Sequence, residues 1–430
     1  MIDLAAPFVM LGNIEWLALL SMFWFMIVLE LPRYTLAFGA VLARALFVRE
    51  RKLTAAERAY LDSLKLSVVI AGHNEAHAIG KCLRSLGEQT RRIDEIIVVD
   101  DGSTDDMRDV INELRRQGLI TTAISNQVRC GKPAATNLGF GFATGDIIVN
   151  LDADCSLDRD AIEKLIEPFV EDHVGATCSP IAVRNHDSSA VTRWQAIEYL
   201  LSICLGKRAL DMLGLVVCAS GAFSAFRREA LDQVGMLSAG SGEDFELTMR
   251  LRRAGWRIAF ADQSWCFTDV PETVAALTRQ RRRWDRDTIR IRFRLFRSVF
   301  NPFARSFSPI ETGEQIEWCV LNLLTTAAFP IYLVWLFYIY AGAALPILLS
   351  VALVYLVLDT IGFGIALFVT RRFGAATIWS LVPYLLTFGL IYAVLMRCVR
   401  LYAYLEEWVW FASRNDPYSP RRVAAQAQFS

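Results

Sequence analysis

Apolar residues dominate both ends of the chain, whereas the middle alternates between short apolar runs and polar segments. Near the N-terminus an almost continuous apolar run extends from Ile14 to Leu29, and apolar residues resume from Leu36 to Leu42. A helix needs about 20 apolar residues to cross a bilayer, so this region predicts one tilted span with an extension along the interface. Beyond Arg305 three further runs have spanning length: Trp318–Tyr340, Leu345–Val369 and Ala375–Met396.

Charged flanks indicate how these spans are oriented. The segment Arg44 to Arg58 is basic, and Arg371 and Arg372 separate the last two apolar runs. An excess of Lys and Arg beside a span marks the cytoplasmic side of a membrane. The final apolar run, Leu401 to Phe411, is short and carries two glutamates, which predicts a helix lying along the interface.

The side of the C-terminus stays open at this level. One span before the central region and three after it would leave the C-terminus outside. The tail is basic, which favours the cytoplasmic side instead; its arginines are Arg414, Arg421 and Arg422.

Leu66 to Trp265 alternates between β-branched runs and amphipathic segments. The expected strands are Leu66–Ala71, Glu95–Val99 and Asp146–Leu151, and the expected helices are Ala78–Leu86, Met107–Arg116 and Pro133–Phe142. This alternation predicts an α/β fold with a mostly parallel, doubly wound sheet, which binds ligands at the carboxyl ends of its strands. Acidic turns directly follow two of the expected strands and would therefore lie at this carboxyl edge of the sheet.

Composition narrows the functional classes. The chain has 430 residues, of which 54% are hydrophobic and 21% are charged, and its mean hydropathy of +0.33 is high for a soluble protein. A formal net charge of zero argues against a nucleic-acid partner. The nine cysteines form no CxxC pair, so we expect free thiols in a reducing compartment, and the four histidines show no metal-ligand spacing.

Two acidic turns follow expected strands. Asp152 and Asp154 lie two residues apart on an extended chain, so both carboxylates can face one ion, and Mg²⁺ or Mn²⁺ prefers such oxygen ligands. The alternative is a solvated turn. Asp100-Asp101-Gly102-Ser103 suits contact with a uracil or ribose, although Asp-Gly-Ser is also a common turn.

Two further turns precede helices. Gly131-Lys132-Pro133 fits either a diphosphate contact or a simple helix start with Pro133 in the first turn. Gly242-Glu243-Asp244 fits either a general base for a sugar hydroxyl or acidic residues that favour a helix N-terminus.

A basic stretch follows, with the sequence Gln280-Arg281-Arg282-Arg283-Trp284. An indole beside arginines suits a sugar ring next to a charged leaving group. The alternative is a basic amphipathic helix on an anionic membrane surface, and both interpretations can hold for one helix.

In this order, the motifs resemble those of the membrane-embedded, processive family 2 glycosyltransferases. The resemblance covers roughly Leu66 to Arg290 and includes the opening segment Val68 to Glu75, in which His73 replaces the usual tyrosine. It implies a GT-A-like (Rossmann-like) cytosolic domain between transmembrane and interfacial helices. It implies an integral protein of the plasma (inner) membrane. The domain boundaries we expect are 1–53 (first membrane segment), 54–278 (GT-A-like domain), 279–310 (basic interface helices), 311–398 (three transmembrane helices) and 399–430 (interfacial helix and tail).

The resemblance also implies roles for single residues. Asp244 would be the catalytic base. The donor nucleotide would contact Glu75, Asp101, Lys132 and Asp152, and a Mg²⁺ or Mn²⁺ ion would bind Asp152 and Asp154. The acceptor terminus and the diphosphate would meet Gln280, Arg283 and Trp284.

The implied reaction inverts the anomeric carbon of a UDP-sugar, with UDP-N-acetylglucosamine as the first choice of donor and UDP-glucose as the second. The acceptor would be a growing polysaccharide that leaves through a channel in the same protein, in contact with membrane lipids and with accessory export subunits. Two alternatives are transfer of one sugar to a membrane lipid and an inactive nucleotide-binding scaffold.

Overall fold

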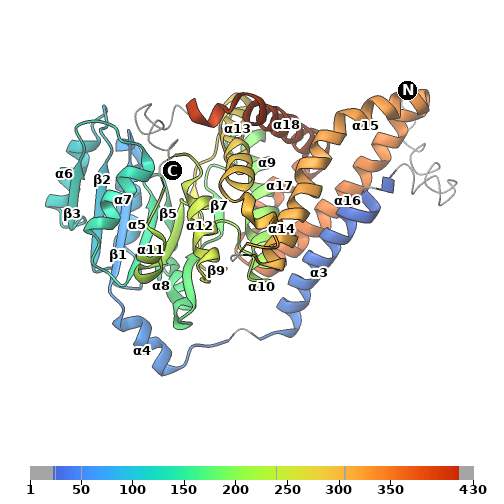
Figure 1. Cartoon of the computed structure of the whole chain (residues 1–430). Helices are drawn as coiled ribbons and strands as arrows, with labels where there is room; N and C mark the ends of the chain where they lie inside the picture. The colour runs from blue at the N-terminus through green and yellow to red at the C-terminus, as the bar shows by residue number, and fades with distance from the viewer. Residues whose placement is uncertain (1–22, 25, 50, 239, 305–306, 416–430) are drawn as a thin grey trace.

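The computed structural model describes residues 23–24, 26–49, 51–238, 240–304 and 307–415, and most of the apolar run predicted at Ile14–Leu29 lies outside them. The described chain has an α/β part and a bundle of long helices beside it (Figure 1). We call the elements from α4 (Ala55–Ser63) to β10 (Cys266–Thr268) the α/β domain.

A seven-stranded mixed sheet forms the centre of the α/β domain. Its strands, in spatial order, are β3 (Thr122–Ser125), β2 (Glu95–Asp100), β1 (Leu66–Gly72), β4 (Ile147–Asp152), β8 (Phe223–Arg227), β6 (Val174–Cys178) and β9 (Arg257–Phe260). The first four strands are parallel, β8 is antiparallel to both of its neighbours, and β6 and β9 are again parallel. The predicted α/β class is therefore confirmed, with one reversed strand in the sheet.

Helices cover both faces of the sheet, as the term doubly wound requires. Val68 and Ile70 of β1 face one apolar cluster, whereas Val69 and Ala71 face another. The first cluster contains residues of α5 (Ala76–Gly87), α6 (Met107–Arg116) and α8 (Ala161–Ile166). The second contains residues of α7 (Lys132–Phe142), α11 (Arg228–Val234) and α12 (Glu243–Arg253).

A small second sheet and a set of helices continue from this core. The small sheet has the order β5 (Ser156–Leu157), β10 and β7 (Ile181–Val183). Helix α9 (Ala190–Glu198) runs on through a π-helical stretch, η3 (Tyr199–Gly206), into α10 (Lys207–Met212). Helix α13 (Val274–Arg290) follows β10, so the boundary expected between residues 278 and 279 falls inside one continuous helix.

Among the described residues, three helical stretches are long and apolar enough to cross a membrane: Met26–Phe47, Pro309–Thr370 and Ala375–Trp410. The first contains η1 (Met26–Glu30) and α3 (Leu31–Phe47). The second consists of α14 (Pro309–Trp318), η6 (Cys319–Leu324), α15 (Thr325–Tyr340), η7 (Ala341–Ala343) and α16 (Ala344–Thr370). The third consists of α17 (Ala375–Thr387), η8 (Phe388–Tyr392) and α18 (Ala393–Trp410).

The long helices differ from the expectation at two places. Leu36–Leu42, expected along the interface, lies inside the first candidate span. The second stretch reverses direction at η7, where Ala341 has a φ of 37°. Helices α15 and α16 therefore run antiparallel to each other, and α3 lies beside them (Figure 1). At 27 residues α16 is about 40 Å long, enough for the roughly 30 Å hydrocarbon core.

Candidate active site

The end of β4 carries the carboxylate pair that the sequence predicted. Asp152 is the last residue of β4, and its backbone N–H donates to the carbonyl of Ala222 at 3.0 Å. The Nζ atom of Lys132 lies 2.6 Å from Oδ1 of Asp152. Asp154 follows two residues later, and the guanidinium of Arg184 donates to its backbone carbonyl at 2.5 Å. Strand β4 thus brings both carboxylates to the carboxyl edge of the sheet.

Helix α7 delivers Lys132 to this edge. The helix begins at Lys132, after Gly131 with a φ of 95°. Further along, a Cβ on Gly139 would lie 2.3 Å from Cγ1 of Val69, so only glycine lets α7 approach β1 this closely. The two glycines at the start and within α7 therefore determine the position of the Lys132 ammonium group.

Asp101 is buried and bound to the loop before α7. Its Oδ1 accepts hydrogen bonds from the backbone N–H of Cys130 at 2.7 Å and from Asn126 at 3.2 Å, and its Oδ2 accepts one from the N–H of Gly131 at 2.7 Å. Asp101 therefore fixes the shape of the loop that precedes Lys132. A nucleotide bound here would contact both this loop and the carboxylate of Asp101.

Helix α12 adds two carboxylates. Asp244 accepts hydrogen bonds through Oδ2 from the N–H of Gly221 at 3.0 Å and through Oδ1 from the N–H of Phe245 at 2.7 Å. Glu243 precedes it in the first turn of the helix. Gly242 has a φ of 74°, and a Cβ there would lie 2.9 Å from both Asp287 Cβ of α13 and Ile291 Cδ1 just beyond it. A glycine is therefore required where α12 starts against α13.

The titration behaviour shows that these groups act on one another. Burial raises the pKa of Asp152 and Glu243, as does the charge of Asp244, while Lys132 opposes the rise at both. For Lys132, desolvation lowers the pKa, but Asp152, Glu243 and Asp244 outweigh it and keep the group protonated. One lysine thus balances the carboxylates of two separate turns.

Glu75 borders the same group from the end of β1. Burial raises the pKa of its carboxyl, and the charges of Asp154 and Asp152 add to the rise while His77 opposes it. Lys132 thus interacts with Asp152, Glu243 and Asp244, while Asp154 and Glu75 border Asp152. We call these six residues the acidic cluster. The ends of β1 and β4 and the start of α12 thus lie together at one edge of the sheet, while Asp101 binds the loop before α7.

A divalent cation fits the donor set only in part. Asp152 and Asp154 offer oxygen ligands of the kind that Mg²⁺ and Mn²⁺ prefer, and the ammonium of Lys132 already lies on one of these oxygens. Within the described residues no group of three or more His, Cys, Asp or Glu side chains has the arrangement of a complete metal site. A cation here would complete its shell with donor phosphates and water.

Helix α13 carries the predicted acceptor motif. The side chain of Trp284 is 38% exposed, and Arg281 lies over its ring at 4.4 Å from the centroid. The Oε1 atom of Gln280 is buried and has no hydrogen-bond partner among the described residues. A buried acceptor without a partner costs free energy, which fits a ligand hydroxyl as its partner. Arg283 lies on the same helix, half-buried.

The sequence did not single out the ion pair that holds this motif. Arg281 donates to Oε2 of Glu198, the last residue of α9, at 2.6 Å. The hydroxyl of Tyr392, from η8, donates to the same oxygen at 2.7 Å. No motif spacing in the sequence indicates that residues so far apart in the chain meet.

Comparison with known proteins identifies the class. A mannosyltransferase from Pyrobaculum calidifontis, solved in complex with GDP-mannose and Mn²⁺, superposes with a TM-score of 0.58 at 19% identity, covering 90% of this chain and 99% of that one. The α/β domain therefore has the fold of the GT-A glycosyltransferases. Residues 67–235 match the sequence profile of glycosyl transferase family 2, and the chain contains a glycosyltransferase domain of that family.

Curated relatives extend the likeness beyond this domain. A poly-β-1,6-N-acetyl-D-glucosamine synthase of Staphylococcus epidermidis is 27% identical over 343 residues, which cover 79% of this chain and 82% of the relative. The synthase of the same name from Staphylococcus aureus strain COL is 32% identical over 227 residues, or 52% of this chain and 55% of the relative. The protein is a membrane glycosyltransferase whose relatives make a polysaccharide.

Proposed function

We propose that this enzyme transfers sugars from a UDP-sugar to a growing polysaccharide with inversion at the anomeric carbon. The observation that carries the proposal is the acidic cluster, in which turns from separate strands and helices surround Lys132 beside the carboxylate pair of β4. The names of the curated relatives support UDP-N-acetylglucosamine as the donor and a β-linked polymer as the product.

Each residue has a separate task in this reaction. Asp244, fixed by two backbone N–H groups, would accept the proton of the attacking sugar hydroxyl. Lys132 would exchange part of its contact with Asp152 for the donor diphosphate, and Glu75 and the loop held by Asp101 would border the nucleotide. Trp284 would stack on the acceptor sugar, with Gln280 bonding one of its hydroxyls and Arg283 near the departing phosphate.

Asp152 and Asp154 would hold Mg²⁺ or Mn²⁺, which when bound neutralises charge on the diphosphate. We place the catalytic domain on the cytoplasmic side of the plasma membrane because nucleotide sugars are cytoplasmic substrates and the segment after the first span is basic.

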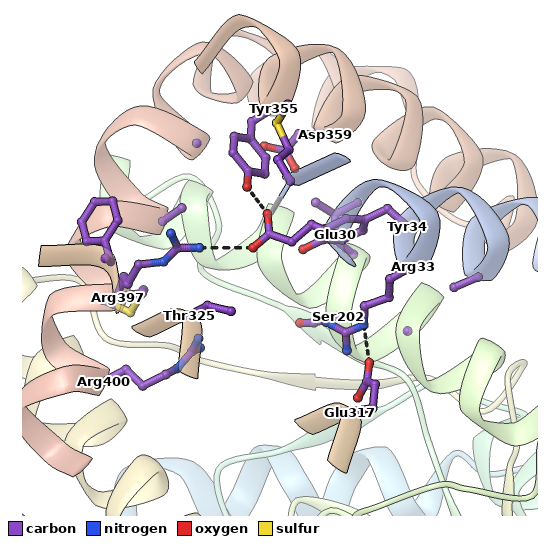
Figure 2. Close-up of a pocket in the computed structure, with 18 of the residues that line it drawn as sticks. Glu30, Arg33, Tyr34, Ser202, Glu317, Thr325, Tyr355, Asp359, Arg397 and Arg400 are labelled. Carbon is purple, nitrogen blue, oxygen red and sulfur yellow. Dashed lines mark hydrogen bonds and ion pairs between the residues drawn. The ribbon is translucent and has the colours of Figure 1, made fainter. Parts of the chain in front are cut away.

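A large cavity among the membrane helices supports export of the product (Figure 2). It has a volume of about 1560 Å³ and is lined by residues of α3, α15, α16 and α18. Its wall includes Glu198, which pairs with Arg281 next to Trp284, so the cavity extends to the residue that holds the predicted acceptor motif. The polar side chains of Tyr332, Tyr355 and Asp359 line it as well.

The same cavity favours a second candidate, transfer of one sugar to a membrane lipid, since much of its lining is apolar. Its charges argue against an anionic lipid. Glutamate and aspartate side chains (Glu30, Glu198, Glu314, Glu317, Asp359) outnumber arginines (Arg33, Arg397, Arg400) in the wall. Like charges repel a phosphate head group, whereas hydroxyl groups of a neutral glycan bond to both kinds of side chain.

The test supplies purified protein with radiolabelled UDP-sugars and measures UDP release and product size. Each measurement is made with Mg²⁺ or Mn²⁺ and again after a chelator has removed the cation. We expect release from UDP-N-acetylglucosamine that depends on the cation, together with a ladder of glycans. A single lipid-sized product would replace the first candidate with the second. No UDP release from any donor would mean that the fold serves only as a nucleotide-binding scaffold.

A further inference from the structure

The last apolar stretch, α17–η8–α18, has the length and hydropathy of a membrane span, but its contacts are those of a segment that stays on one side. Its start follows the loop Arg371–Gly374, which docks on the α/β domain. Arg372 forms an ion pair with Asp158, and the ring of Phe373 lies 5.7 Å from that of Trp265, edge to face.

The other end of the stretch contacts α13 and the turn after it, and α13 itself packs against the α/β domain at Gly242. Arg282 of α13 pairs with Glu406 at 2.7 Å. Arg294, just beyond α13, pairs with Glu407, also at 2.7 Å, and Glu407 is buried. Figure 1 shows α18 running back toward α13 while α3, α15 and α16 extend away together. Both ends of Ala375–Trp410 are therefore anchored to the same body.

The middle of the stretch does not reach the far side either. The indole of Trp194 in α9 donates to the hydroxyl of Thr387 at 3.0 Å. Leu381 and Leu385 pack in one apolar cluster with residues of α9 and with the half of α16 next to the loop. The cluster at the far ends of α15 and α16 contains Phe23, Leu336, Ala344 and Ile347, and none of its described members comes from α17, η8 or α18.

The backbone supplies the bend that such a course needs. A straight helix of 36 residues would be about 54 Å long, far more than the hydrocarbon core requires. Pro383 stands inside α17, and the π-helical stretch η8 follows it. Proline and π-helical turns are established causes of helix kinks.

We propose that α17–η8–α18 is a re-entrant segment in the leaflet next to the α/β domain, so that α3, α15 and α16 are the crossings and the C-terminus lies on the side of the α/β domain. The outward face of this segment would contact the interfacial region of the bilayer. The outward face is apolar and rich in tryptophan, with Trp379 71% and Trp410 67% exposed, and tryptophan favours the membrane–water interface.

The crossings agree with this placement. Phe23, three residues before the first stretch, packs with Leu336 and Ala344 near the η7 turn, so these parts share the far side. From there α3 returns to the α/β domain, α15 leads out and α16 leads back. The basic tail and the pair Arg371–Arg372 then fall on the side where positive charge is expected.

The test uses the full chain in sealed membrane vesicles of both orientations. One version carries an epitope tag after Ser430, and a matched version carries it between Gly342 and Ala343 in the turn after α15. We expect protease to remove the C-terminal tag in the vesicles in which it digests the α/β domain. The tag in the turn should be removed only in vesicles of the other orientation, in which the α/β domain is protected.

Loss of the C-terminal tag in vesicles that protect the α/β domain would overturn the proposal. Mass spectrometry of the untagged chain after the same digestion covers the case in which a tag disturbs folding. Peptides released from beyond Asn415 should appear together with peptides of the α/β domain, and their appearance in the other vesicles would also overturn it. The result does not depend on the reaction proposed above.

Discussion

Single side chains decide the chemistry at the edge of the sheet, and Asp244 is the one on which transfer depends most. Replacing Asp244 with Asn keeps an acceptor for the N–H of Gly221 but removes the proton acceptor. Since general bases contribute about 10²- to 10⁴-fold, we expect kcat to fall by at least about 10²-fold while UDP binding persists.

The measurement is UDP release together with UDP affinity by calorimetry. Asp232→Asn, an exposed change on α11, is the matched control and should leave both values unchanged. Normal turnover in Asp244→Asn would assign the base to another residue.

Glu243 gives a prediction about pH. Burial raises the pKa of Glu243 above its value in an unfolded chain, so ionising it costs folding free energy. This cost is absent at about pH 4, where the carboxyl is largely protonated in both states, and it develops as the pH rises through the folded value. Glu243→Gln should therefore raise the melting temperature in detergent at about pH 7.5 and change it little at about pH 4. An equal shift at both values would mean that the charge is not the cause.

At the scale of elements, the contact of α12 with α13 depends on Gly242. Gly235 has the same left-handed backbone, but nothing lies within 4 Å of its would-be Cβ, whereas at Gly242 that atom meets Asp287 and Ile291. Gly235→Ala should cost about 1 kcal/mol from backbone strain. Gly242→Ala should lower stability further and also reduce transfer, because α12 carries Asp244. Equal thermal shifts for the two variants would contradict the close contact.

Glu198 links three elements, since α9, α13 and η8 meet at its carboxylate. The side chain of Glu198 is 24% exposed, so leaving Arg281 without this partner should cost about 1 to 3 kcal/mol. We expect activity to fall most in Glu198→Ala, less in Glu198→Gln and least in Tyr392→Phe, which removes one hydrogen bond only. The loss of activity should appear as a higher KM for an added oligosaccharide acceptor, whereas KM for the donor should stay nearly constant. A change in donor KM alone would remove Glu198 from the acceptor side.

Much of this element structure follows from sequence periodicity. The helix expected at Met107–Arg116 is α6 as observed, and the strands expected at Leu66–Ala71 and Glu95–Val99 differ from β1 and β2 by one residue each. Local patterns contain this information because each element buries one face. The reversal of β8 between β4 and β6 was not predictable, since strand direction is set by connections across the whole sheet.

The candidate site was predictable in the same way, residue by residue but not contact by contact. Asp152, Asp154 and Asp244 were chosen from local motifs; Asp152 and Asp244 interact with Lys132, and Asp154 lies beside Asp152. The bonds of Asp101 to the N–H groups of Cys130 and Gly131 depend on the shape of a loop. The pairing of Glu198 with Arg281 joins residues on different helices, so no motif spacing indicates it.

At the scale of the whole molecule, one of the contacts between the α/β domain and the membrane helices is the ion pair of Arg372 with Asp158, at the loop between α16 and α17. Asp158→Arg should place a positive charge against Arg372 and loosen this attachment, lowering the melting temperature. Combining it with Arg372→Asp restores opposite charges and should recover most of the loss. A double variant as unstable as the single one would show that the pair does not hold the domain.

The close approach of α7 to β1 has a consequence for how relatives are sought. The reach of the Lys132 ammonium toward Asp152 is decided two helical turns away, at Gly139, where a methyl group would collide with Val69. A search that compares only the positions touched by ligands would accept a chain with alanine at 139. In such a chain the helix would stand further from the sheet, and a lysine at the correct position in the alignment would meet its partner from the wrong place.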